Sequence, residues 1–204
     1  GVAIATFGAI RHKLGEMTAR EYALESLLYR TAGLIDETIA AGGGTAAATL
    51  AALEEFAVEA SIAKVYGSEV VDYIIDECVQ IHGGNGFVAD YPVERRYRDA
   101  RVNRIFEGTN EINRLLVPGM LMKRALKGEL PLLAAAKQLQ DEIMSPSMAL
   151  PDASDRPLTD EARACGIFKK VVLLVAGTAM QTYGAKVEQE QEVLSYLADI
   201  LIDT

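Results

Sequence analysis

The sequence has 204 residues, half of them apolar and 24% charged, so its composition is that of a globular protein and not of a disordered or collagen-like chain. The formal net charge of -9 argues against a protein whose main task is to bind nucleic acid phosphates. No uninterrupted apolar run approaches the roughly 18 residues of a membrane span, and we expect a chain that does not cross a membrane.

The cysteines and the first residues of the sequence indicate in which cellular compartment the protein is expected. Cys78 and Cys165 are too few for a disulfide framework or a closed zinc site, so we expect two reduced thiols. Residues 1–17 show no charged leader followed by an apolar segment and a cleavage site. These features favour a cytoplasmic protein. Because the sequence opens on Gly1 and stops directly after an apolar periodic run, we expect a piece of a longer protein.

Two long helices are predicted in the first eighty residues. Across residues 7–40, apolar residues recur every three or four positions, as on one face of an amphipathic helix. The glycines at 42–44 should end this helix, and a second should occupy residues 45–81. Helices of this length joined by a short turn are expected to pack antiparallel.

The rest of the chain is predicted to be helical on either side of irregular segments. Glycines and a proline make residues 82–108 irregular, and we expect the chemistry there. Helix should resume at Thr109, a favourable N-cap, with Glu111 in its first turn. Residues 145–157 indicate a linker. No alternating pattern supports a sheet, so we predict an all-α fold. Further helices are expected at 132–144, 159–183 and 187–202.

The sequence GGNGF at residues 83–87 allows the backbone to approach a ligand closely, because glycine lacks a Cβ and permits positive φ. It does not have the GxGxxG spacing and follows no predicted strand, so it is not a dinucleotide-binding fingerprint. The alternative is a plain loop that ends a helix, which is a frequent role of glycine.

Five arginines and two acidic residues lie between positions 94 and 104, a local excess of positive charge. Such a patch can hold a phosphate or pyrophosphate through forked guanidinium hydrogen bonds. The commoner alternative is structural, with arginines in a solvated stripe or in ion pairs between helices.

Glu107 lies between the apolar residues Ile105 and Phe106 and Gly108, just before a predicted helix start. Removal of a carboxylate from water strengthens it as a base, so Glu107 is a candidate general base. The alternative is a glutamate that only interacts with the helix dipole.

Cys78 and His82 are four residues apart, which is the spacing of a metal-binding pair on a helix. No further cysteine or histidine lies nearby, and we therefore expect no metal site.

Three stretches of the sequence together resemble a known family. QIHGGNGF at 80–87 and YRDARVNRIFEGTNEINR at 97–114 resemble the C-terminal helical domain of acyl-CoA dehydrogenases, and FGAIRHKLGEM at 7–17 is similar to the opening of that domain. The resemblance implies an up-and-down four-helix bundle over 1–128 that carries the base and FAD contacts. Residues 129–204 would form a truncated helical extension similar to that of the very-long-chain members. The family's N-terminal helical domain and central β-domain would be absent from this chain, and we expect the isolated piece to be inactive.

The resemblance also implies a reaction. In the family, a glutamate removes the α-proton of an acyl-CoA thioester while N5 of FAD accepts a hydride from the β-carbon, which gives a trans-2-enoyl-CoA. That glutamate falls on Glu107, whose backbone N–H would donate to the thioester carbonyl together with a flavin ribityl hydroxyl. Phe106, Glu107 and Gly108 would contact the substrate. Phe106 replaces the tyrosine of the medium-chain members and favours long acyl chains.

The same resemblance implies cofactor contacts and partners. Gln80, Gly83 and Gly84 would contact the FAD of a neighbouring subunit. Thr109 and Glu111 would contact the subunit's own FAD. We accordingly expect a homo-oligomer, with a dimer favoured, that acts on acyl-CoA in fatty acid β-oxidation and passes electrons to electron-transfer flavoprotein. No nucleic acid partner is expected.

Two other functions stay open at this point. An acyl-CoA oxidase uses the same base and flavin but lets oxygen reach the reduced cofactor. A non-catalytic helical module would use the bundle only as a docking surface. Glu107 favours an enzyme, because a scaffold does not need a carboxylate at that place beside a glycine-rich loop.

The predicted helix near the C-terminus carries an apolar run at 171–175 that follows two lysines. A helix with basic flanks can lie on anionic lipid. The three glutamates between 188 and 192 would be repelled from such a surface, so we do not expect membrane association. We expect instead a stripe buried on the bundle, made of Val171, Leu174, Val175 and Thr178.

Overall fold

The computed structural model describes residues 1–144 and 157–204. Within these ranges the chain is helical with no strand, which confirms the predicted all-α fold. The predicted linker lies almost wholly outside the described residues. The chain divides into two compact units, Gly1–Asn113 and Arg114–Thr204. This division falls upstream of residue 128, where the family resemblance places the end of the bundle.

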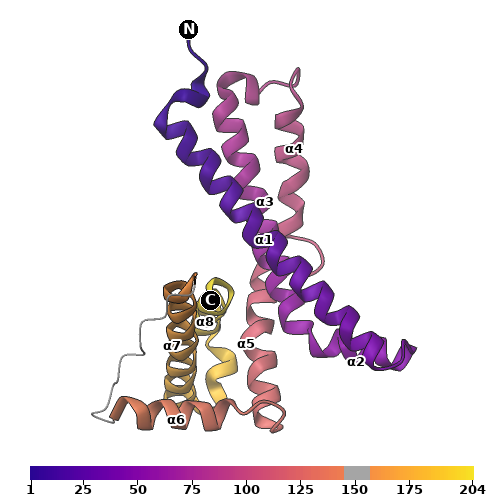
Figure 1. Ribbon diagram of the computed structural model, residues 1–204, viewed down its shortest axis with the longest axis vertical. Coiled ribbons are helices and arrows are strands. Elements are labelled where there is room, and N and C mark those ends of the chain that lie inside the picture. The colour runs from indigo at the N-terminus through magenta and orange to yellow at the C-terminus, as the bar shows by residue number, and fades with distance from the viewer. Residues whose placement is uncertain (145–156) are drawn as a thin grey trace. The chain divides into compact units, whose positions relative to one another are not determined.

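The first unit is built around three helices that pack on one another. Helix α1 (Gly8–Ala41) lies antiparallel to α3 (Ala57–His82), and α4 (Pro92–Arg101) packs on α3 (Figure 1). Val65, in the middle of α3, is fully buried. The antiparallel arrangement predicted from the glycine turn is therefore confirmed. A short 3-10 turn, η1 (Ile4–Thr6), precedes α1.

The second long helix is interrupted, contrary to the prediction of one helix over 45–81. The chain forms α2 (Ala46–Glu55) and then α3, and the helix breaks at Phe56, where φ is -97° and ψ is 19°. Thr45 caps α2 by accepting a hydrogen bond from the backbone N–H of Ala48 at 3.1 Å. No glycine or proline marks the break, so the apolar periodicity runs through it without a signal.

Helix α4 was not predicted, because residues 82–108 were expected to be irregular. Its sequence nevertheless carries helix signals: Pro92 at the first turn, Glu94 near the N-terminus, and basic residues in the last turn, where the helix dipole favours them. The remainder of the segment contains two 3-10 turns, η2 (Gly83–Gly86) and η3 (Val102–Arg104).

The helices of the second unit are α5 (Asn110–Leu126), whose residues 110–113 belong to the first unit, α6 (Leu132–Met144), α7 (Thr159–Tyr183) and α8 (Gln191–Asp203), with a 3-10 turn η4 (Gly184–Gln189) before α8. Helix α7 packs against α6 and α8. An ion pair joins α5 to α8, with the Nε of Arg114 at 2.7 Å from Oδ1 of Asp199. The apolar core of this unit contains Ala179, Val187 and Leu194 and is extended by Leu115, Met122, Met180 and Val193.

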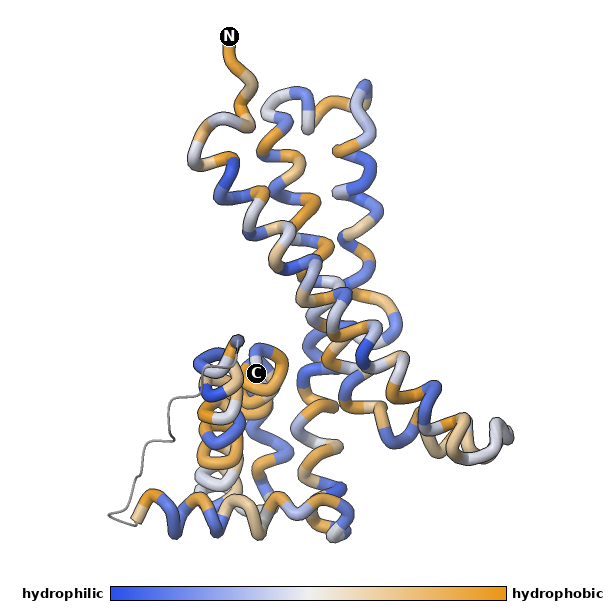
Figure 2. Tube along the Cα trace, viewed as in Figure 1, coloured by the Kyte–Doolittle hydropathy of each residue, from blue (hydrophilic) through white to orange (hydrophobic). Residues whose placement is uncertain are grey.

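The buried stripe predicted on α7 is wrong. Val171 and Leu174 are 39% and 49% exposed, and Thr178 is also exposed. The side of α7 that packs on the core is the one with Ala179 and Met180. Figure 2 shows apolar residues along the length of α7, with polar residues between them.

Helix α7 also has the length and composition of a helix able to cross a membrane, and 6% of its most apolar window is buried. This criterion considers length and composition only. The absence of a long uninterrupted apolar run therefore does not exclude α7 as a membrane-crossing helix by length and composition.

Candidate active site

The candidate base, Glu107, lies in a loop with an unusual backbone. Its φ is 55°, and the φ of Gly108 is 79°, so two successive residues are left-handed. Outside glycine, this conformation costs roughly 1–2 kcal/mol per residue. Strained residues persist only where the surroundings hold them, and they concentrate at functional sites. Glu107 is thus in the type of conformation that a functional requirement can maintain.

Two side chains hold the carbonyl oxygen of Gly108. The Nζ of Lys64 donates to it at 2.6 Å, and the Nδ2 of Asn113 donates at 3.0 Å. Asn113 Nδ2 also lies 3.1 Å from the carbonyl oxygen of Thr109. The φ of Gly108 favours glycine there, and a Cβ at this position would crowd Asn113 Nδ2 at 3.1 Å.

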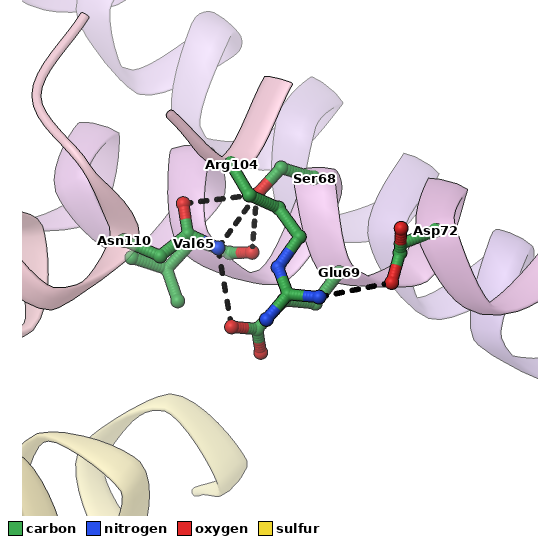
Figure 3. A network of polar contacts seen from close by, with 6 residues as sticks. All are labelled: Val65, Ser68, Glu69, Asp72, Arg104 and Asn110. Atoms are coloured by element: carbon green, nitrogen blue, oxygen red, sulfur yellow. Dashed lines mark hydrogen bonds and ion pairs between the residues drawn. The ribbon is translucent and has the colours of Figure 1, made fainter. Parts of the chain in front are cut away.

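A buried polar network underlies this loop, centred on Asn110, which is 1% exposed (Figure 3). Its Oδ1 accepts from Nζ of Lys64 at 2.8 Å, and its Nδ2 donates to Oγ of Ser68 at 2.9 Å and to Oε1 of Glu69 at 3.1 Å. Ser68 in turn donates to the carbonyl oxygen of Val65 at 3.0 Å. The amide of Asn110 is satisfied on both sides, which a buried polar group needs. The start of α5 is thereby fixed to α3.

The five arginines between positions 94 and 104 differ in their surroundings. The Nη1 of Arg104 lies 3.0 Å from Oδ2 of Asp72 on α3 (Figure 3). This supports the structural alternative for Arg104, which ties η3 to the long helix. The other four side chains are exposed: Arg95, Arg96, Arg98 and Arg101.

The residues expected at the N-terminus of α5 have the predicted geometry. The Oγ1 of Thr109 accepts from the backbone N–H of Ile112 at 3.3 Å, as an N-cap does. Glu111 lies in the first turn with its side chain exposed. The N-terminus of a helix favours negative charge, including phosphate.

The glycine-rich loop follows α3 directly. Gly83 has φ 58° and ends the helix, so the structural alternative is correct as far as it goes. Gln80, Gly83 and Gly84 are all exposed, and no atom lies within 4 Å of a Cβ built on either glycine. Gly86 differs, because a Cβ there would lie 2.4 Å from the carbonyl oxygen of Val79. The loop thus combines an open backbone surface with one position at which glycine is sterically required.

Cys78 and His82 lie one turn apart near the end of α3. The Nδ1 of His82 lies 2.7 Å from the carbonyl oxygen of Cys78, so this nitrogen is engaged with the backbone. Among the residues that the structure describes, no group of three or more potential metal ligands exists. Burial raises the pKa of the Cys78 thiol, and the positive charge of Arg96 opposes this shift in part.

The structure brings only part of the predicted site together. Phe106, Glu107, Gly108 and Thr109 are consecutive in the loop, but the Glu107 side chain is exposed and Phe106 is 47% exposed. The described residues therefore do not supply the apolar enclosure expected around the carboxylate.

Sequence reasoning missed the residues that hold the loop, namely Lys64, Ser68, Asn110 and Asn113. A signal exists for two of them, because Lys64 and Ser68 are four residues apart and share one face of a helix whose neighbouring positions are apolar.

Comparisons with known proteins agree with the resemblance seen in the motifs. Residues 1–121, and separately residues 167–204, match the family described as "Acyl-CoA dehydrogenase, C-terminal domain". The chain is 48% identical to the "Probable acyl-CoA dehydrogenase" of Bacillus subtilis (strain 168) over 97% of this chain and 34% of that protein. It is 42% identical to the "Very long-chain specific acyl-CoA dehydrogenase, mitochondrial" of Homo sapiens over 57% of this chain and 16% of that protein.

A solved structure is also similar. The crystal structure of an acyl-CoA dehydrogenase complexed with FAD from Bacillus anthracis matches with a TM-score of 0.92 and 48% sequence identity. The match covers 98% of this chain and 34% of that one. The chain therefore spans about a third of the length of these two bacterial relatives, and the helical arrangement described above is one that a solved protein adopts.

Proposed function

The chain belongs to the acyl-CoA dehydrogenase family, and from this premise we propose that it supplies the catalytic base and part of the FAD site of an oxidoreductase that dehydrogenates acyl-CoA thioesters. The observation that carries the proposal is the left-handed Glu107–Gly108 pair, which Lys64 and Asn113 hold through the Gly108 carbonyl. A strained carboxylate at this place has a clear use as a base and none in packing, since its side chain is exposed.

In the proposed reaction, the carboxylate of Glu107 accepts the α-proton of the thioester. The electron pair of the broken C–H bond moves toward the carbonyl oxygen, which becomes enolate-like. The backbone N–H of Glu107 donates a hydrogen bond to that oxygen, so one residue both removes the proton and stabilises the charge that results. Bound FAD supplies the acceptor for the β-hydrogen, which leaves as a hydride.

The described residues fit a dinucleotide cofactor in two places. Gly83 and Gly84 present a backbone with open space around it, and Gln80 lies beside them with an exposed side chain. Thr109 and Glu111 lie at the N-terminus of α5, where the dipole favours phosphate. We assign the first place to the FAD of a neighbouring subunit and the second to the subunit's own FAD.

A homo-oligomer, with a dimer favoured, follows from the first assignment. The loop after α3 carries exposed apolar side chains, and Phe87 is 85% exposed. Burial of such side chains against a second subunit gives a favourable free energy of association. The mass of the FAD-containing protein in solution tests this proposal, and a monomer would contradict it.

We place the substrate among long-chain acyl-CoA esters of fatty acid β-oxidation. The support is Phe106, which is half-exposed next to the base, and the similarity to a very-long-chain specific relative. Limiting rates of flavin reduction with acyl chains of increasing length test this part of the proposal. A maximum at short chains would contradict it.

Electron-transfer flavoprotein is the proposed acceptor, because a reduced flavin must pass on two electrons before the next turnover. The alternative, an oxidase, differs only in letting oxygen reach the reduced flavin. Stopped-flow reoxidation in air separates the two, since we expect slow reoxidation by oxygen and fast reoxidation by the flavoprotein.

Glu107→Gln in the complete FAD-containing protein tests the main claim. We expect FAD to stay bound and anaerobic reduction by acyl-CoA to slow by at least about a hundredfold, as for loss of a general base. Reduction of Glu107→Gln at the wild-type rate would show that another group is the base, whereas a wild-type protein that acyl-CoA does not reduce would favour a module without a catalytic role. Glu21→Gln, at an exposed position of α1, is the matched control.

A further inference from the structure

One half-buried cation in the first unit has no role in the proposed reaction. Lys64 lies on α3, forty-four residues before the loop that it contacts, and its side chain is partly buried. We propose that Lys64 is a positioning residue, which sets the place of Glu107 by holding the Gly108 carbonyl oxygen. This inference rests on the proposed role of Glu107 as the base.

The geometry gives Lys64 two simultaneous contacts. Its Nζ is 2.6 Å from the Gly108 carbonyl oxygen and 2.8 Å from Oδ1 of Asn110. The first oxygen belongs to the loop and the second to the first residue of α5. One ammonium group therefore joins the loop of the base, the start of the next helix and the middle of α3.

The contact on Gly108 acts at a position where the backbone needs support. Glu107 and Gly108 are both left-handed, and a glutamate relaxes from that conformation unless it is held. The Gly108 carbonyl is one peptide unit away from the residue that carries the base. A fixed carbonyl restricts the torsions of both residues, and hence the direction of the Glu107 side chain and of its N–H.

Lys64 is the stronger of the two holding groups. Hydrogen bonds from a charged donor are roughly twice as strong as neutral ones, and Asn113 supplies only a neutral amide. Asn110, by contrast, keeps the hydrogen bonds that its Nδ2 donates to Ser68 and Glu69 when Lys64 is removed. Loss of the ammonium should therefore release the loop more than it loosens Asn110 from α3.

A comparison with Lys13 separates positioning from general stabilisation. Lys13, on α1, is also partly buried and pairs with the carboxylate of Glu77 on α3. It ties two helices of the same unit but contacts no residue of the loop. Lys13→Met is thus a matched control for removal of a half-buried ammonium.

The test uses Lys64→Met in the complete FAD-containing protein, with acyl-CoA as the probe. Methionine keeps an unbranched side chain but has no donor. We expect FAD content to be retained, and the limiting rate of anaerobic flavin reduction to fall about 10-fold to 100-fold, the effect of a displacement of about 1 Å at a reacting group. The dissociation constant for acyl-CoA should change by less than about threefold, since Lys64 fixes the base and does not bind the ester.

Lys64→Arg should recover part of the lost rate because it keeps a charged donor, and Lys13→Met should leave the rate within about twofold. A wild-type limiting rate in Lys64→Met would overturn the inference. So would an equal loss in Lys13→Met. If Lys64→Met does not fold, Lys64→Gln takes its place. A wild-type limiting rate in Lys64→Gln would likewise overturn the inference.

Failure of the proposed function gives a different result. In that case the wild-type protein itself is not reduced by acyl-CoA, or Glu107→Gln is reduced as fast as the wild type. A third pattern separates the two claims: acyl-CoA reduces the wild type and Lys64→Met equally fast but does not reduce Glu107→Gln. In that case the proposed function stands and only the positioning role of Lys64 is wrong.

Discussion

The ammonium nitrogen of Lys64 lies 2.6 Å from the carbonyl oxygen of Gly108, across a sequence separation of 44 residues. The hydrogen bond links α3 to the loop that carries Glu107. It exists only because α3 folds back beneath the start of α5, so the position of the candidate base depends on tertiary packing and not on the loop sequence alone.

The left-handed conformation of Glu107 predicts an unusual order of stabilities. Glycine adopts positive φ without the steric cost that a Cβ brings, so we expect Glu107→Gly to unfold with a free energy about 1 kcal/mol higher than Glu107→Ala. Urea denaturation of both variants measures the difference. At Glu21, in the interior of α1, the order should be reversed, because alanine is the better helix former by about 1 kcal/mol. The same order at both positions would contradict a left-handed Glu107.

The buried amide network predicts a large cost for Asn110→Ala. The change removes the amide of Asn110, which accepts from Lys64 and donates to Ser68. The polar groups of Lys64 and Ser68 then lose this partner within the protein interior. We expect a loss of about 2–3 kcal/mol in the free energy of unfolding. Asn85→Ala, at an exposed position, should change it by less than about 0.5 kcal/mol. Equal effects at the two asparagines would show that the network does not stabilise the fold.

The raised pKa of Cys78 predicts slow alkylation. A higher pKa leaves less thiolate at a given pH, so at pH 8 to 9 Cys78 should react with iodoacetamide more slowly than the exposed Cys165. Because the folded pKa is raised, any stability linked to the neutral thiol is present below the pKa of the unfolded chain and is lost as the pH rises through the folded value. Peptide mass spectrometry after timed labelling measures both sites.

A charge variant refines this test. Arg96 lowers the Cys78 pKa in part, so Arg96→Gln should slow the alkylation of Cys78 further and leave Cys165 unchanged. Arg95→Gln serves as the control of equal charge change. Faster labelling of Cys78 in Arg96→Gln would refute the electrostatic explanation.

The sequence predicted the fold where local patterns are sufficient. The helix of residues 8–41, its glycine turn and the antiparallel return of α3 follow from apolar periodicity and from turn chemistry. The break at Phe56 does not, since nothing in the local sequence differs from helix. Helix α4 does not follow from the pattern, because the glycines on both sides of it favour irregular structure, although Pro92 and Glu94 mark its start.

The sequence predicts a candidate base and a helix cap, but it does not predict the residues that hold the loop. The motif around Glu107 identifies the candidate base and the cap at Thr109. Lys64 and Asn110 were not found, because the partner of each lies more than forty residues away and a motif within one segment contains no trace of it. The error on α7 has a related cause: periodicity indicates that a helix has an apolar face but not which face a neighbour covers, and Leu174 is exposed while Ala179 is buried.

The most direct test of the account is the exchange of α-protons catalysed by the complete protein. In an acyl-CoA with sulfur in place of the β-methylene, no hydride can leave, so incorporation of deuterium from D2O at the α-carbon reports proton removal alone. We predict that the wild-type protein catalyses this exchange and that Glu107→Gln slows it by at least about a hundredfold, with FAD still bound. Exchange by Glu107→Gln at the wild-type rate would show that another group is the base and would contradict the central claim.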